Sequence, residues 1–134
     1  MNLLPGVTSH YVQTSRLKMH YLAYGPSDGI PVVLIHGNLS TGRFYEHLMP
    51  NAPDGYRFIM PDMRGFGDTE RLPLDATRGL RDWADDTYAL MQTLEIKQPV
   101  HLAGWSTGGA ATSKRRCAAW AEPASTASAK TSAS

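Results

Sequence analysis

The residues whose type and spacing most clearly allow chemistry are Gly104-x-Ser106-x-Gly108. A serine hydroxyl can attack a carbonyl carbon when it stands on a sharp turn between a strand and a helix. Such a turn needs small residues two positions to either side, because strand and helix approach closely there. The turn also directs the first amides of the helix at the point where negative charge develops. The motif predicts a nucleophilic Ser106; the alternative interpretation is a glycine-rich turn without chemical importance.

A second segment, His36-Gly37-Asn38, directly follows the apolar run at residues 30–35. We expect the backbone N–H of Asn38 to act as an oxyanion donor opposite the backbone N–H of Thr107. Asparagine also tolerates turn geometry, so a purely turn-forming role for Asn38 is the alternative. We interpret His36, at a strand end, as a structural residue that satisfies backbone groups of the loop.

A third segment, residues 62–69, follows the apolar run at residues 56–60 and reads Asp-Met-Arg-Gly-Phe-Gly-Asp-Thr. We predict a structural role for it, in which Asp62 and Arg64 pair and hold the loop down. The glycines at positions 65 and 67 permit tight turns.

The elements that position these segments follow from the apolar pattern. Strands are predicted at residues 9–13, 17–24, 30–35, 56–60 and 99–103, of which the last three are short apolar runs typical of parallel sheets. In the first two strands, the residues predicted to face inward are Tyr11, Leu17, Met19, Tyr21 and Ala23.

Helices are predicted between these strands. Ser40 or Thr41 is a suitable N-cap for a short helix that ends at Pro50. Residues 78–94 show the clearest helical periodicity, with apolar and charged residues on opposite sides. Strands that alternate with helices predict an α/β fold with a parallel sheet and crossover helices.

Taken together and in this order, the three segments resemble the α/β-hydrolase family. The family pattern is a strand ending in His-Gly-x, a later strand ending in Asp-x-Arg-Gly-x-Gly-x-Ser, and then the Gly-x-Ser-x-Gly elbow; Thr69 replaces the usual serine. The resemblance covers about residues 8–112. It implies a three-layer, mostly parallel sheet with an antiparallel edge formed by the first two strands. It also implies Ser106 as nucleophile and the amides of Asn38 and Thr107 as the oxyanion hole.

The activity implied by the resemblance is hydrolysis of an ester or related acyl bond of a small molecule, through an acyl-enzyme on Ser106. A serine rather than an aspartate at the elbow disfavours the dehalogenase and epoxide-hydrolase branches of the family. No cofactor is expected. Residues 104–109 have the glycines of a phosphate loop but lack its lysine. The five histidines form no i, i+4 pair and no cluster with Cys117, so no metal site is expected either.

In this fold the catalytic triad runs Ser, then Asp or Glu, then His along the chain. After Ser106 the sequence has no histidine and no aspartate, and Glu122 is the only acid. We therefore expect a chain truncated after the nucleophile strand and inactive by itself. The alternative to an enzyme is a catalytically inert remnant or a non-catalytic binding module. In a chain truncated after the nucleophile strand, the strand at residues 99–103 would lack a neighbour on one side, which predicts aggregation or loose folding.

The composition changes near residue 113. We assign residues 1–112 to the N-terminal part of an α/β-hydrolase domain. Residues 113–134 are an Ala/Ser/Thr-rich tail, which we expect to be disordered or read out of frame.

Composition also limits partners and location. The net charge of +1 gives no field that would attract nucleic acid. No apolar run reaches the roughly 18 residues needed to span a bilayer, and no signal peptide is apparent. The single cysteine cannot form an internal disulfide, which favours a cytoplasmic protein.

Overall fold

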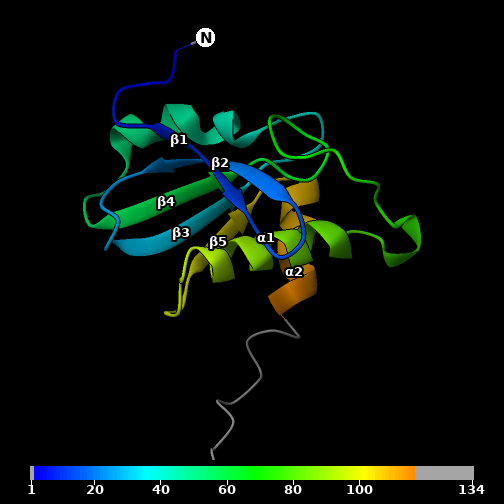
Figure 1. Cartoon of the computed structure of the whole chain (residues 1–134). Coiled ribbons are helices and arrows are strands. Elements are labelled where there is room, and N and C mark those ends of the chain that lie inside the picture. The colour runs from blue at the N-terminus through cyan, green and yellow to red at the C-terminus, as the bar shows by residue number, and fades with distance from the viewer. Residues whose placement is uncertain (1, 117–134) are drawn as a thin grey trace, which may run out of the picture.

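The computed structural model describes residues 2–116, which form a sheet with helices on both faces (Figure 1). The sheet order is β1-β2-β4-β3-β5. The strands are β1 (Thr8–Gln13), β2 (Lys18–Tyr24), β3 (Ile30–Ile35), β4 (Tyr56–Pro61) and β5 (His101–Gly104). β1 pairs with β2 and β2 with β4 in antiparallel fashion, whereas β4, β3 and β5 are parallel. The predicted α/β class with an antiparallel edge is therefore confirmed. The predicted tail lies outside the described residues from residue 117 onward.

β3 lies inside the sheet, between β4 and β5, and its apolar residues contribute to two cores. Successive side chains of a strand point to opposite faces of the sheet. Val33 and Ile35 accordingly belong to the core cluster beneath α1, whereas Leu34 belongs to the cluster beneath the short helix η1. The continuous apolar run of β3 thus places the segment that follows it, residues 36–38, at the carboxyl end of a strand packed on both faces and paired on both sides.

The helices form the two outer layers (Figure 1). On one face lies the 3-10 helix η1 (Gly42–Asn51), whose N-cap Thr41 accepts a hydrogen bond from the Arg43 N–H, as predicted. On the other face lie α1 (Arg81–Thr93) and α2 (Thr107–Arg116). The predicted helix at residues 78–94 begins three residues late, because the short helix η2 (Ala76–Arg78) ends at Gly79, which adopts a positive φ of 62°.

One predicted inward residue is wrong. Leu17, Met19 and Tyr21 are buried as expected, but the side chain of Tyr11 is 54% exposed. The register explains the difference, because Tyr11 pairs with His20 whereas Val12 pairs with Met19. Val12 therefore shares the face of Met19 and packs against the core, while Tyr11 points to the opposite face.

The predicted pair between Asp62 and Arg64 is also wrong. Arg64 instead forms a bidentate ion pair with Asp86 of α1, in which Nε–Oδ2 and Nη2–Oδ1 are both 2.8 Å. Asp62 binds His20 and the backbone N–H of Gly42, on the η1 face of the sheet. The two side chains leave the loop towards opposite layers, so they fix it to both. Gly65 and Gly67 have φ values of 82° and 51°, which confirms the tight turns.

β5 lies at an edge of the described sheet. It pairs with β3 from Val32↔His101 to Ile35↔Gly104, and no other strand of residues 2–116 flanks it. The expectation of aggregation through this edge stays a prediction. Among the described residues, no helix has the length and apolar character required to cross a membrane.

Candidate active site

Ser106 stands on a strained turn between β5 and α2. Its φ of 53° lies in the left-handed region, which a residue with a side chain adopts only where the surroundings enforce it. Two backbone hydrogen bonds fix the turn: Trp105 N–H donates to Ile35 O at 3.1 Å, and Gly108 N–H donates to Trp105 O at 2.9 Å. The turn therefore presents Ser106 at the surface, beyond the carboxyl end of β5.

The glycines of the motif are required by close backbone contacts. A Cβ added to Gly104 would lie 2.5 Å from the carbonyl carbon of Gly108. A Cβ added to Gly108 would lie 2.2 Å from the carbonyl oxygen of Ile35. Real Cβ atoms do not approach backbone atoms this closely, so the spacing of the motif reflects packing of the start of α2 against the ends of β5 and β3.

The segment at residues 36–38 lies beside Ser106. A Cβ added to Gly37 would lie 3.2 Å from the Cβ of Ser106 and 2.3 Å from Cε3 of Trp105. Asn38 is exposed in the turn that follows, next to Leu39 with a φ of 56°. Within residues 2–116, no recorded hydrogen bond engages the backbone N–H of Asn38 or of Thr107. The structure thus brings the first two sequence motifs together at one point.

His36 supports this loop from inside. It is fully buried; its Nδ1 donates to the Gly37 carbonyl at 2.7 Å, and its Nε2 accepts from the Met63 N–H at 2.9 Å. Burial lowers the pKa of His36, against smaller opposing effects from the Gly37 carbonyl and Asp62, so the neutral ring is favoured. Both ring nitrogens are engaged, which confirms the structural interpretation of His36.

His101 lies at the wrong end of β5 to act on Ser106. It pairs with Val32 at the beginning of the strand, and its ring lies 6.2 Å from that of Tyr56. In the described part of the chain, no recorded hydrogen bond joins Ser106 to a histidine. Within residues 2–116, the site therefore combines a strained turn with a serine hydroxyl that has no recorded histidine partner.

An apolar surface flanks Ser106, and the sequence motifs did not reveal it. The rings of Phe44 and Trp105 stack with centroids 5.2 Å apart and an interplanar angle of 18°. Both side chains are about half exposed, and Leu39 nearby in the chain is 90% exposed. The only sequence signal for this surface is Trp105 itself, the variable residue between Gly104 and Ser106.

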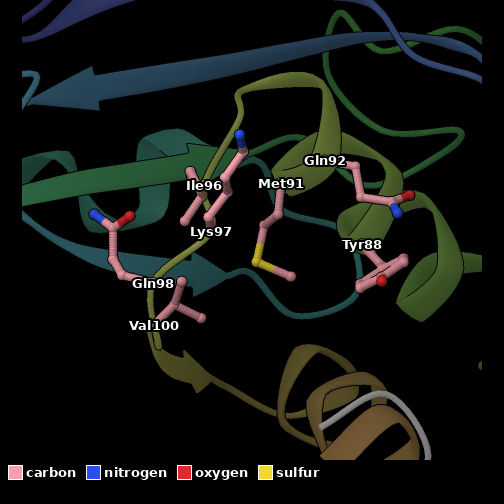
Figure 2. A pocket seen from close by; sticks show the side chains of 7 residues that line it. All are labelled: Tyr88, Met91, Gln92, Ile96, Lys97, Gln98 and Val100. Carbon is pink, nitrogen blue, oxygen red and sulfur yellow. The ribbon is translucent and has the colours of Figure 1, made fainter. Parts of the chain in front are cut away.

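A cavity of about 170 Å³ lies between the end of α1 and the segment that leads into β5 (Figure 2). Figure 2 shows Met91 and Tyr88 of α1 on one side and Val100 on the other. Val100 precedes β5 whereas Ser106 follows it, so this cavity lies at the opposite end of the strand from Ser106.

The comparison with protein families agrees with the fold and the motifs. A sequence profile of the alpha/beta hydrolase fold matches residues 30–113 of the chain. The chain therefore belongs to the alpha/beta hydrolase fold family, which confirms the resemblance drawn from the sequence.

Relatives within the family carry several activities. The chain is 40% identical over 100 residues to a cis-3-alkyl-4-alkyloxetan-2-one decarboxylase of Xanthomonas campestris pv. campestris, covering 69% of this chain and 33% of that protein. It is 41% identical over 69 residues to a haloalkane dehalogenase of Mycobacterium marinum, covering 47% of this chain and 23% of that protein. An epoxide hydrolase from an endophytic Streptomyces superposes with a TM-score of 0.75 at 22% identity, covering 86% of this chain and 34% of that chain, which shows the fold alone.

The chain thus spans about a third of the length of the decarboxylase and of the epoxide hydrolase. The names of the three relatives describe three different reactions. Membership of the family therefore does not identify the reaction, which must be inferred from the residues around Ser106.

Proposed function

We propose that residues 1–112 form the nucleophile-bearing half of a serine hydrolase that cleaves an ester or related acyl bond of a small molecule. The observation that carries the proposal is the backbone of Ser106, held at a φ of 53° between β5 and α2. Strain of this kind persists where the surrounding structure over-determines it, and it is frequent at nucleophile positions.

In the proposed reaction, Ser106 Oγ attacks the acyl carbon and forms a tetrahedral intermediate. The backbone N–H groups of Asn38 and Thr107 donate to the oxygen that becomes negative. The serine proton passes to a base, and the leaving alcohol departs with a proton, so that an acyl-enzyme remains. Water then hydrolyses the acyl-enzyme. Two observations on the described residues support this assignment: the backbone N–H groups of Asn38 and Thr107 have no recorded hydrogen bond, and Gly37, which precedes Asn38, packs against Ser106.

Two further features indicate the kind of substrate: one favours an apolar group, and the other favours an acyl group. The stacked rings of Phe44 and Trp105 offer an exposed apolar surface beside the serine. Serine at position 106 favours acyl transfer over the chemistry of the dehalogenase and epoxide-hydrolase branches, although two of the relatives above carry those names.

A second candidate function is a non-catalytic binding module or inert remnant. It is favoured by the described residues, in which no recorded hydrogen bond joins Ser106 to a histidine and both ring nitrogens of His36 are engaged. Loss of the histidine from a serine triad costs on the order of 10⁶ in turnover, whereas an oxyanion hole alone retains roughly 10³–10⁴ over water. We therefore expect slow reaction at Ser106 in this chain.

The test is labelling of the folded chain with a fluorophosphonate, followed by mass spectrometry of the modified peptides. We expect slow phosphonylation of Ser106, absent in Ser106→Ala and unchanged in Ser113→Ala, an exposed serine of the same helix. Failure of the folded wild-type chain to form an adduct at Ser106 would support the inert module instead.

A further inference from the structure

A second serine of the chain lies in a hydrogen-bonded array with a histidine and an aspartate. Ser9 Oγ lies 2.8 Å from His20 Nε2. On the other side of the same ring, His20 Nδ1 lies 2.8 Å from Asp62 Oδ2. A nucleophile within hydrogen-bonding reach of a base, with the base oriented by a third group, is the arrangement that activates a serine.

The sheet brings these three residues together from distant parts of the sequence. In the β1–β2 pair, Ser9 lies opposite Leu22 and Tyr11 lies opposite His20. Ser9 and His20 are therefore diagonal neighbours on one face of the sheet. Asp62 directly follows β4, which pairs with β2 from Tyr24↔Phe58 to Tyr21↔Pro61. Its carboxylate consequently reaches the ring of His20 from the far side.

The surroundings of Asp62 fix the direction of these hydrogen bonds. Burial acts to raise its pKa, but hydrogen bonds from His20, the Asp68 N–H and the Gly42 N–H outweigh burial and lower it below the ordinary value. Asp62 is thus a carboxylate that can only accept. With Asp62 as acceptor, the Nδ1 of His20 is the donor, and in the tautomer with its single proton on Nδ1 the Nε2 lone pair accepts the Ser9 hydroxyl.

The three residues differ in their exposure to solvent. His20 is 5% exposed and Asp62 is 3% exposed, whereas Ser9 is exposed. Ser9 and His20 line a cavity of about 340 Å³ on this face, whose wall includes Leu22 and Arg43. Asp62 also lines this cavity, so a small molecule bound there can meet the Ser9 hydroxyl beside the largely buried base and acid.

We propose that Ser9 is a second nucleophile of this chain, activated by His20 and oriented through Asp62, and that it accepts an acyl or phosphoryl group from a small electrophile bound in the adjacent cavity. As the Ser9 Oγ bond to the carbonyl carbon or phosphorus forms, its proton moves to His20 Nε2. The leaving group departs with its bonding electron pair, and His20 returns the proton to it or to water. This site is separate from Ser106 and does not rest on the function proposed for the elbow.

The test uses diisopropyl fluorophosphate on the intact chain, in which the Ser9 O–P bond forms and the P–F bond breaks. Tandem mass spectrometry then follows the adduct at each serine with time. Ser15 and Ser27 are exposed serines without a histidine partner among the described residues, so they are internal controls for accessibility. General-base assistance typically gives 10²–10⁴-fold, so we expect Ser9 to react at least about 10²-fold faster than Ser15.

Two variants separate this proposal from its competitors. Ser106→Ala must leave the adduct at Ser9 unchanged. The proposals for Ser9 and Ser106 are therefore tested separately, and a missing adduct at one serine does not contradict the proposal for the other. Ser9→Ala must abolish that adduct and leave Ser15 unchanged. Equal rates at Ser9 and Ser15 in the folded wild-type chain would overturn the proposal and reduce Ser9 to a hydrogen-bond partner of His20.

Discussion

Ser106 lies on a strained turn beside two unengaged backbone amides of the described chain, whereas Ser9 lies on a regular strand beside a buried His20–Asp62 pair. Efficient serine chemistry needs both a proton acceptor and a place for the developing negative charge. We propose that this chain divides the two requirements between Ser106, beside the Asn38 and Thr107 amides, and Ser9, beside His20. The contrast separates what the backbone of the fold provides from what side chains must add.

The two sites also depend on different kinds of interaction. Backbone contacts that admit no Cβ at Gly104 or Gly108 form the elbow. The second site depends on hydrogen bonds between side chains, which a substitution can remove without moving the backbone. Changes to the glycines and changes to the carboxylate should therefore affect the two serines differently.

The largest effect is expected from Gly108→Ala. The added methyl group would meet the carbonyl oxygen of Ile35 at 2.2 Å, a backbone atom that cannot turn aside. Overpacking typically costs about 1–3 kcal/mol, and we expect a loss of unfolding free energy at or above the upper end of that range, with loss of the Ser106 adduct. Urea unfolding followed by circular dichroism measures the first effect and fluorophosphonate labelling the second.

Gly109→Ala is the matched control for that variant. Its added Cβ would lie 3.0 Å from the Gly104 carbonyl oxygen, a milder contact in the same helix. We expect a clearly smaller loss of stability than in Gly108→Ala. Equal losses in both variants would mean that the elbow is not the tight point described here.

Asp62→Asn should act on the other serine. The amide no longer holds the Nδ1 proton of His20 by charge, so the ring loses its preferred orientation and tautomer. We expect the rate at Ser9 to fall to that of Ser15, a drop of at least about 10²-fold, while the rate at Ser106 is retained. Peptide-resolved labelling measures both rates in one sample. A parallel fall at Ser9 and Ser106 would indicate general unfolding instead.

Acid should weaken the two regions in different pH ranges. Burial lowers the pKa of His36 below its ordinary value of 6.5. The unfolded chain therefore binds a proton at His36 more readily than the folded chain does. The free energy of unfolding consequently falls as the pH drops below about 6.5. The lowered pKa of Asp62 contributes stability above pH 3.8, which is lost only as the pH falls further, through the folded pKa. The loop anchored by His36 should therefore loosen first.

Amide hydrogen exchange between pH 7 and pH 5 checks this order. The Met63 N–H binds His36 Nε2, and the Gly42 N–H binds Asp62 Oδ1. After correction for intrinsic rates, protection should fall at Met63 and persist at Gly42. His36→Gln should remove the response at Met63, because its amide oxygen accepts without titrating. A response unchanged by that substitution would contradict the assignment to His36.

The smallest effect is expected from Phe44→Ala at the apolar surface beside Ser106. An aromatic pair contributes about 0.5–1.5 kcal/mol beyond its buried area, so the preference of Ser106 for a long-chain over a short-chain phosphonate should fall about twofold to thirteenfold. Leu48→Ala, exposed on the same helix η1, is the control and should leave the preference unchanged. The ratio of the two labelling rates is the measurement. An unaltered ratio in Phe44→Ala would remove the surface from the proposed substrate site.

The sequence was most informative where local pattern and backbone geometry coincide. The apolar runs, the cap at Thr41 and the glycine spacing around Ser106 each depend on neighbours in the chain, and the structure agrees with them. Tyr11 was misplaced because the facing of an edge strand depends on its register with β2. The partners of Asp62 and Arg64 were misassigned because each binds a residue that folding brings from another layer.

The array at Ser9 could not be predicted for the same reason. Ser9 and Asp62 are far apart in the chain, and only the pairing of β1, β2 and β4 places both beside His20. The stack of Phe44 on Trp105 likewise joins η1 to the elbow across the end of the sheet. Contacts between elements decide these features, and neither spacing nor periodicity carries them.

The central proposal, that Ser106 faces an oxyanion hole formed by Asn38 and Thr107, is tested most directly by a crystal structure of the chain phosphonylated at Ser106. We predict that the phosphonyl oxygen lies about 2.7–3.1 Å from the backbone nitrogens of both residues, the range for a formed oxyanion hole. A phosphonyl oxygen directed into solvent, with neither amide in contact, would contradict the account.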